Sequence, residues 1–152
     1  MVLPPFAVIL ETHQRVVWRY LVAMAGPQDG ADLYQETLLA ALRTYPDLRD
    51  ATNLRSWLLT IAHAKVIDGA RSASRRPVPV AEPTPAVAHL PEPADDELWG
   101  AVSRLPDKQR AAVVARYVGD LPYSEVARVV GCTEPAARQN VRAGLARLRE
   151  EL

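Results

Sequence analysis

The sequence predicts an all-α protein made of two small helical domains, and three observations lead to this prediction. Apolar residues recur at three- and four-residue steps in successive segments, as on the buried face of a helix. No segment shows the strict apolar and polar alternation of a half-buried strand. Six of the thirteen prolines fall between Arg76 and Asp95. We therefore expect a first domain over residues 1–76, a proline-rich linker over residues 77–94 and a second domain over residues 95–152.

The first domain contains three helical patterns. The first ends at Gly26, because the proline that follows cannot continue a helix. The second opens at Asp29 or Gly30 and stops at Pro46, and Asn53 is a good cap for a long third helix. The residues expected in the buried stripes are Phe6, Leu10, His13, Val17, Tyr20, Leu21 and Met24, then Leu33, Tyr34, Leu38, Leu42 and Tyr45, and finally Leu54, Trp57, Leu58 and Ile61.

The linker is expected to be extended and semi-rigid. Each proline removes a backbone donor and disfavours the helical conformation of the residue before it. Fully extended in the polyproline manner, residues 77–94 would span on the order of 50 Å. That length is enough to hold the two domains well apart.

The second domain begins near Asp95, where an acidic cluster favours a helix amino terminus. Another helix starts at Pro106. Residues 123–152 then predict a helix-turn-helix, in which Gly131 allows a left-handed turn and Thr133 caps the last helix. The residues expected to pack inward are Leu98, Val102 and Leu105, then Val113, Val114 and Tyr117, then Ala127, and last Ala137, Val141, Leu145 and Leu148.

The last helix also has an outward face that suits DNA. Arg138, Gln139 and Arg142 point away from its apolar stripe. Arginine can donate two hydrogen bonds to guanine and glutamine can pair with adenine, so this face has the chemistry of base reading in the major groove. A helical hairpin with a solvated basic face is the alternative, because many all-helical proteins that never touch DNA contain one.

The charges of the chain balance, with eighteen basic and eighteen acidic residues, so no overall field draws the protein onto nucleic acid. Basic residues nevertheless gather at residues 55–76 and 134–149. We expect weak DNA binding by the isolated protein.

The sequence does not indicate an enzyme, a metal site or a cofactor. His13, His63 and His89 lack the spacing of metal ligands, and the single Cys132 excludes an internal disulfide and disfavours a structural zinc. The glycines form no phosphate-binding loop and no nucleophile elbow. We expect no small-molecule substrate.

Neither a signal peptide nor a membrane span is expected. The apolar run at residues 2–10 contains Pro4 and Pro5 and lacks a basic leader. No run reaches the roughly 18 apolar residues of a membrane helix. A lone cysteine fits a reducing compartment, so the sequence predicts a cytoplasmic protein without a membrane partner.

Four stretches in order resemble the extracytoplasmic function (ECF, group IV) sigma factors of bacterial RNA polymerase. Residues 29–37 are similar to the acidic D-L-x-Q-E-[TA] stretch of conserved region two. Residues 53–62 and 67–71 resemble the W-L-x-x-I-A and D-x-x-R segments that follow it. Residues 105–110 and the helix-turn-helix resemble region four. The resemblance covers nearly the whole chain and implies a transcription initiation factor.

The resemblance also implies roles for particular residues. Trp57 belongs to the apolar stripe of its helix, so we interpret it as core and not as a base contact. For the basic residues at the end of that helix, contact with DNA and simple exposure to solvent are equally weighted interpretations. The implied contacts are Asp32, Gln35 and Glu36 with core polymerase, Asn53, Arg55, His63, Lys65, Arg71, Arg75 and Arg76 with the minus-10 element, and Thr133, Glu134, Arg138, Gln139 and Arg142 with the minus-35 element.

Two alternatives to a sigma factor stay open. One is a helix-turn-helix regulator that works without polymerase, and the other is a sigma-like decoy that binds polymerase or a regulator without initiating transcription. The family often carries Gly-Thr-Val-Lys-Ser-Arg where this chain has residues 135–140, so a base preference cannot be transferred. The resemblance also implies an anti-sigma factor as a further partner.

Overall fold

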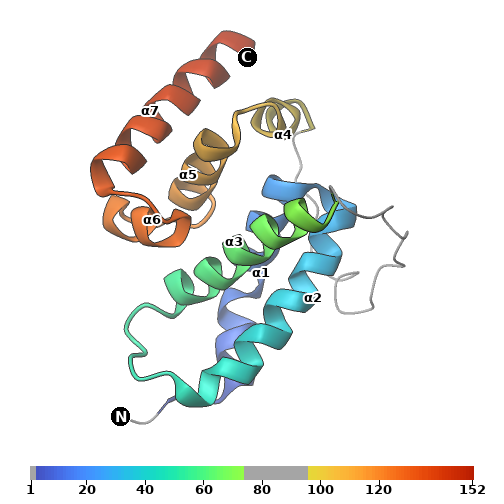
Figure 1. The fold of residues 1–152 in the computed structure, drawn as a ribbon, viewed down its shortest axis with the longest axis vertical. Coiled ribbons are helices and arrows are strands. Elements are labelled where there is room, and N and C mark those ends of the chain that lie inside the picture. Colours follow the sequence, from blue (N-terminus) through green and yellow to red (C-terminus); the bar gives the residue numbers. More distant parts are fainter. Residues whose placement is uncertain (1–2, 74–95) are drawn as a thin grey trace.

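The computed structural model describes residues 3–73 and 96–152, which fold into helices joined by short loops (Figure 1). Three α-helices precede the linker and four follow it in this described part, and none is long and apolar enough to cross a membrane. The all-α prediction is confirmed. The linker, Arg75, Arg76 and the side chain of Arg71 lie outside the described residues, so the domain boundaries and the linker conformation stay predictions. The elements are α1 Phe6–Ala25, α2 Pro27–Thr44, the 3-10 turn η1 Tyr45–Asp47, α3 Leu54–Ala73, α4 Asp96–Ser103, α5 Asp107–Tyr117, α6 Tyr123–Val130 and α7 Glu134–Glu151.

Helices α1 and α2 meet at a sharp turn around Gly26. This glycine has a φ of 87°, which a residue without a Cβ adopts at little cost, and its N–H donates to the carbonyl oxygen of Val22 at 2.8 Å. Helix α2 starts immediately at Pro27, because the first position of a helix has no N–H partner to lose. The predicted start at Asp29 or Gly30 was therefore too late.

Helices α1, α2 and α3 enclose the core of the first domain. Trp18 meets Tyr34 edge to face, with ring centroids 5.6 Å apart. Trp57 is half-buried against this core, and its ring lies 6.0 Å from that of Tyr45. Trp57 thus packs against the edge of the core, as its place in the apolar stripe predicts.

The second domain packs α5 and α6 against the long α7. Gly131 has a φ of 74° in the turn, and Thr133 Oγ1 accepts a hydrogen bond from the backbone N–H of Ala136 at 3.2 Å. The predicted turn and cap are confirmed. Helices α5 and α7 approach closely at Gly144, where an added Cβ would lie only 2.6 Å from Cγ2 of Val113.

Two residues that the apolar pattern placed in the core are exposed. Leu42 is 52% exposed, and the neighbouring Ala41 is fully buried in its place. Tyr117 is 59% exposed, whereas Ala115 on the same helix is fully buried. In both helices a small alanine is buried and the larger apolar side chain near it is turned to solvent.

The two domains pack against each other, so the expectation that the linker holds them well apart is wrong. Helix α3 lies against α6, and α1 lies against α4 and α5 (Figure 1). Arg110 Nη1 donates to the carbonyl oxygen of Met24 at 3.0 Å, across the contact of α5 with the end of α1. A Cβ at Gly119 would lie 2.9 Å from Cδ1 of Leu59, so the chain between α5 and α6 sits directly on α3.

Candidate nucleic-acid and polymerase interfaces

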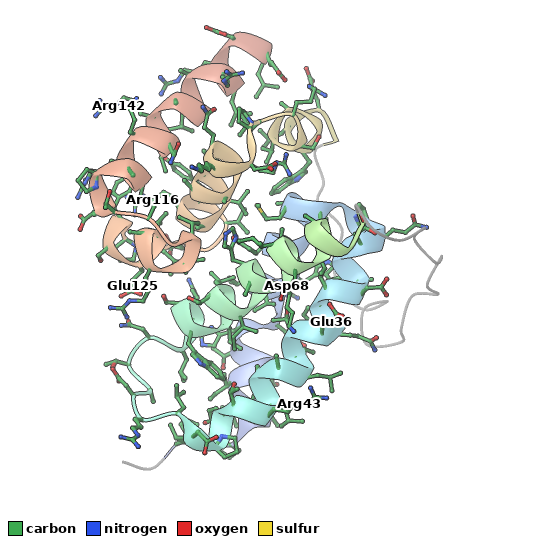
Figure 2. The ribbon with its side chains drawn as sticks, in the orientation of Figure 1. Glu36, Arg43, Asp68, Arg116, Glu125 and Arg142 are labelled. Atoms are coloured by element: carbon green, nitrogen blue, oxygen red, sulfur yellow. The ribbon has the colours of Figure 1, made fainter. Side chains whose placement is uncertain are left out.

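The predicted polymerase contacts share one exposed face of α2. Asp32, Gln35 and Glu36 are all exposed, and the three- and four-residue steps between them bring them together on the helix surface. Within the described residues, neither Asp32 nor Glu36 forms an ion pair. Glu36 points away from the second domain (Figure 2). The face therefore offers unpaired carboxylates to a partner.

Exposed leucines continue this face along α2. Leu39 and Leu42 are each 52% exposed, and they follow Glu36 at three and six residues. Exposed apolar side chains that lie together and are rimmed by polar ones can mark a protein-binding surface. Neither leucine was predicted as a surface residue, because the apolar pattern placed Leu42 in the core and Leu39 lies outside that pattern.

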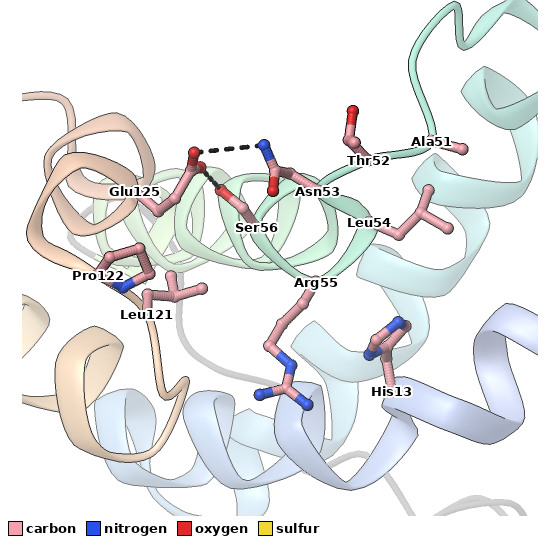
Figure 3. Close-up of a pocket in the computed structure, with 10 residues that line it drawn as sticks. All are labelled: His13, Ala51, Thr52, Asn53, Leu54, Arg55, Ser56, Leu121, Pro122 and Glu125. Carbon is pink, nitrogen blue, oxygen red and sulfur yellow. Dashed lines mark hydrogen bonds between the residues drawn. The ribbon is translucent and has the colours of Figure 1, made fainter.

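The start of α3 is covered by Glu125 of α6. Ser56 Oγ donates to Glu125 Oε2 at 2.5 Å, and Asn53 Nδ2 donates to Glu125 Oε1 at 3.4 Å (Figure 3). The Glu125 side chain is only 13% exposed. Asn53 precedes α3 as predicted, and its carbonyl oxygen accepts from the Trp57 N–H at 2.9 Å, but its side chain is directed to Glu125. The sequence offered no signal for Ser56.

Arg55 reaches from α3 to the same part of the second domain. Its Nη1 donates to the carbonyl oxygen of Gly119 at 3.4 Å and lies 4.0 Å from Oδ2 of Asp120. Asp120 is 89% exposed, so this ion pair is weak, and the backbone contact fixes the guanidinium more firmly. Two of the predicted minus-10 residues, Asn53 and Arg55, are therefore engaged by the second domain.

A cavity of about 330 Å³ lies between the domains at this contact (Figure 3). His13, Asn53 and Arg55 line it from the first domain, and Leu121 and Glu125 line it from the second. His13 Nδ1 is buried without a hydrogen-bond partner, and its burial, followed by the nearby Arg55 charge, lowers the pKa of the ring. Among the described residues, no His, Cys, Asp or Glu side chains gather in a group that could hold a metal ion.

His63 and Lys65 differ from the other predicted minus-10 residues in their position. His63 is only 9% exposed, and its Nδ1 shares a hydrogen bond of 2.8 Å with the Tyr20 hydroxyl. Burial lowers the pKa of His63 and raises that of Tyr20, so both groups stay neutral near pH 7. The structure thus places His63 in the core, where it cannot contact DNA. Lys65 is partly exposed.

The predicted minus-35 residues lie on the open side of α7. Arg138, Gln139 and Arg142 are exposed, and Arg142 points away from both domains (Figure 2). Arg138 Nη2 lies 2.7 Å from Oε1 of Glu134 one turn earlier. The hydroxyl of Thr133 already accepts the capping bond at the start of the helix.

Tyr123 holds Arg138 from the side. The guanidinium carbons of Arg116 and Arg138 each lie 4.6 Å from the centroid of the Tyr123 ring. Arg116 is in turn fixed by its Nη1, which donates to the carbonyl oxygen of Leu121 at 2.7 Å. Stacking on an aromatic face orients a guanidinium. Tyr123 could not be predicted from the local sequence, since its role depends on the crossing of α5, α6 and α7.

Both halves of the chain match models of known protein families. Residues 9–76 match Sigma-70 region 2, and residues 95–148 match Sigma-70, region 4. The two matches together leave out the linker and a few terminal residues. They fall on α1 to α3 and on α4 to α7, the two groups of helices seen in the fold.

Individual relatives show the same similarity. The chain is 32% identical to the ECF RNA polymerase sigma factor SigD of Mycobacterium tuberculosis, over 95% of this chain and 75% of that protein. It is 31% identical to the ECF RNA polymerase sigma factor RpoE of Cereibacter sphaeroides, over 66% of this chain, and the match spans 59% of that relative's length. The fold is similar to that of the sigma factor RpoE from Bartonella quintana, solved with the anti-sigma factor NepR, with a TM-score of 0.80, 20% identity and 96% and 95% of the two chains covered.

Proposed function

We propose that this chain, which belongs to the extracytoplasmic function sigma factors of the sigma-70 family, binds core RNA polymerase and directs it to specific promoters. It would act in the cytoplasm, as a transcription initiation factor and not as an enzyme. The observation that carries the proposal is the pair of surfaces on opposite sides of the molecule: an acidic and apolar face on α2 and a basic reading face on α7.

The α2 face supplies the polymerase contact. Asp32, Gln35 and Glu36 provide acceptors for a basic partner surface, and Leu39 and Leu42 provide apolar area at its edge. Charges steer the encounter, and apolar side chains that become buried on binding add a hydrophobic contribution to affinity. We therefore add both leucines to the three predicted contacts.

The α7 face supplies the minus-35 contact. Arg138, Gln139 and Arg142 are free to enter a major groove, and the amino terminus of α7, with Thr133 and Glu134, would lie near the DNA backbone. Glu134 orients Arg138 through their ion pair. Held between that carboxylate and the Tyr123 ring, Arg138 is the residue best placed to read a base.

The minus-10 contact would lie at the start and along the length of α3. Asn53, Arg55 and Lys65 stay in this proposal, as do Arg71, Arg75 and Arg76. We do not retain His63, because its ring supports the helix from inside through Tyr20. An anti-sigma factor is a further proposed partner, by analogy with the Bartonella quintana sigma factor that was solved with one.

Reconstitution with bacterial core RNA polymerase tests the function. The template is a DNA library with two short randomised blocks upstream of a transcribed reporter, and the run-off transcripts are sequenced. A sigma factor yields transcripts enriched for one pair of blocks, and core polymerase alone does not. Binding to core without transcripts would instead support the decoy, and DNA selection without core binding would support the independent regulator.

The α2 contact is tested in the same system. Asp32→Ala together with Glu36→Ala should weaken core binding in a pull-down titration, because two unpaired carboxylates are removed from the proposed interface. Glu97→Ala with Glu150→Ala removes the same charge from two exposed carboxylates that form no ion pair among the described residues, and serves as the matched control. Equal losses in the two pairs would contradict the assignment of this face.

A further inference from the structure

Glu125 occupies the surface through which the first domain would bind the minus-10 strand. Both of its carboxylate oxygens are used, one by Ser56 at 2.5 Å and the other by Asn53 at 3.4 Å. Arg128, one turn later on α6, lies 3.8 Å from Oε1, and the carboxylate remains 13% exposed. An acid from the second domain is thus seated among donors of the first (Figure 3).

Those donors form a set that suits the oxygens of a nucleic-acid strand. A serine hydroxyl, an asparagine amide and the Arg55 guanidinium all donate hydrogen bonds, and such groups are the usual partners of phosphate oxygens. They stand at the wall of the cavity between the domains. A carboxylate offers the same negatively charged acceptors as a phosphate, so it can fill the same place.

The surrounding contacts keep Glu125 in position. The Arg55 guanidinium bonds the carbonyl oxygen of Gly119, and Gly119 rests against Leu59 with no room for a Cβ. These contacts lie on the loop that leads into α6. A DNA strand and α6 cannot cover the start of α3 at the same time.

We propose that Ser56, Asn53 and Arg55 form a binding site for a backbone phosphate of single-stranded DNA, and that Glu125 is its built-in occupant in the free protein. The proposal rests on the proposed function, and it adds Ser56 to the DNA-binding residues and regulation to the minus-10 surface. Release of Glu125 must precede strand binding. The second domain therefore restrains the first until a partner separates them.

The test measures DNA binding by the full-length free protein. The probe is a fluorescein-labelled pool of single-stranded DNA of random sequence, and binding is followed by fluorescence anisotropy at low salt. Glu125→Ala should bind about fivefold tighter than the unaltered protein, the equivalent of one hydrogen bond that no longer competes. Glu150→Ala removes the same charge from an exposed end of α7 and should change binding less than twofold, within the usual effect of one screened surface charge.

A second variant separates strand binding from a general gain of positive charge. Ser56→Ala combined with Glu125→Ala should lose most of the gain, because the hydroxyl that would take the phosphate is gone. If the gain survives without Ser56, it comes from Arg128 or from net charge, and the proposal is overturned. It is equally overturned if Glu125→Ala and Glu150→Ala bind alike. Circular dichroism verifies that each variant is folded.

Hydrogen exchange gives an independent readout. In Glu125→Ala the amides of residues 53–57 should exchange faster than in the unaltered protein, and the DNA pool should slow them again. Unchanged exchange of these amides would contradict the proposal that Glu125 occupies the phosphate site. The run-off assay distinguishes this proposal from the proposed sigma function. Promoter-specific transcripts without any effect of Glu125→Ala on DNA binding would contradict only the role of Glu125. Absence of transcripts would contradict the sigma function itself.

Discussion

The two proposed DNA-reading surfaces are built from similar side chains but differ in their access to solvent. On α7, Arg138, Gln139 and Arg142 face outward, and no side chain of the first domain meets them among the described contacts. At the start of α3, Asn53 and Arg55 are engaged by α6 and by the loop before it. The difference shows that the docking of the domains, and not local sequence, sets which surface is available. In this arrangement only one of the two proposed DNA-reading surfaces, the one on α7, is accessible.

The hydrogen bonds that join the two domains act beside apolar contacts such as that of Gly119 with Leu59. Hydrogen bonds such as Ser56 to Glu125 and Arg110 to the Met24 carbonyl each contribute about 1 kcal/mol net. A partner that binds only the separated domains can overcome them, because a ligand shifts an equilibrium by its difference in affinity for the two states. Core polymerase, engaged through α2, would be such a partner.

The largest effect is expected from disrupting the second domain, which carries the exposed DNA-reading face on α7. Gly144→Val should destabilise the second domain by about 3 kcal/mol, since the new side chain overlaps Val113 in a packed core. Ala146→Val, on an exposed position of the same helix, is the control for helix propensity. Urea unfolding followed by hydrogen exchange should show the loss in residues 96–152 first. A uniform loss over both domains would mean that the two do not unfold separately.

Removal of Arg138 comes next in size. Arg138→Ala should cost about 2 kcal/mol of discrimination at one minus-35 base pair, measured with the reconstituted polymerase on promoters substituted at each position. Arg147→Ala, at an exposed position nine residues later and on the opposite side of the helix, should leave the discrimination unchanged. If Arg138→Ala acts equally on every sequence, it contacts the backbone and does not read a base.

Substitution of Tyr123 should have a smaller effect on the same base discrimination by Arg138. Tyr123→Leu should remove about 0.5–1 kcal/mol of the Arg138 discrimination, because the ring that orients the guanidinium is lost. Tyr123→Phe keeps the aromatic face and should keep the discrimination. Loss of discrimination in both variants would point to the hydroxyl or to folding, in place of the stacking.

The stability of the two domains should depend differently on pH, because buried histidines occur in the first domain. The pKa values of His13 and His63 are lowered by burial, so between pH 7.5 and 5.5 the unfolded chain takes up protons that the folded first domain does not. Stability of the first domain should therefore fall as the pH drops below about 6.5, the ordinary histidine value. Residues 95–152 contain no histidine and should change little. Hydrogen exchange at the two pH values checks this, and an unchanged first domain would contradict it.

Local sequence was sufficient to predict most of the fold. Prolines, glycines and caps act within one or two turns, which is why the turn at Gly131 and the cap at Thr133 were predicted correctly. Leu42 and Tyr117 were misplaced because apolar periodicity identifies a stripe, whereas the crossing helix decides which of its residues is covered. Pro27 was misread as a break, although proline suits the first helical position.

The candidate site was less predictable where it depends on the docked domains. The outward face of α7 follows from its own periodicity. The contact of Ser56 with Glu125 joins residues 69 positions apart across the linker, and neither residue carries a local signal of it. The burial of His63 likewise depends on Tyr20 of another helix, so its position after a helical motif suggested a surface role that the packing does not allow.

A distance measurement between the two domains shows whether α6 covers the start of α3 in the free protein. Spin labels at Arg49→Cys and Arg142→Cys, in a Cys132→Ser background, report the separation of the two domains by double electron–electron resonance. We expect a single narrow distance for the free protein, which broadens and lengthens with Glu125→Ala and on binding core polymerase. A broad distribution in the free protein, unchanged by Glu125→Ala, would contradict it.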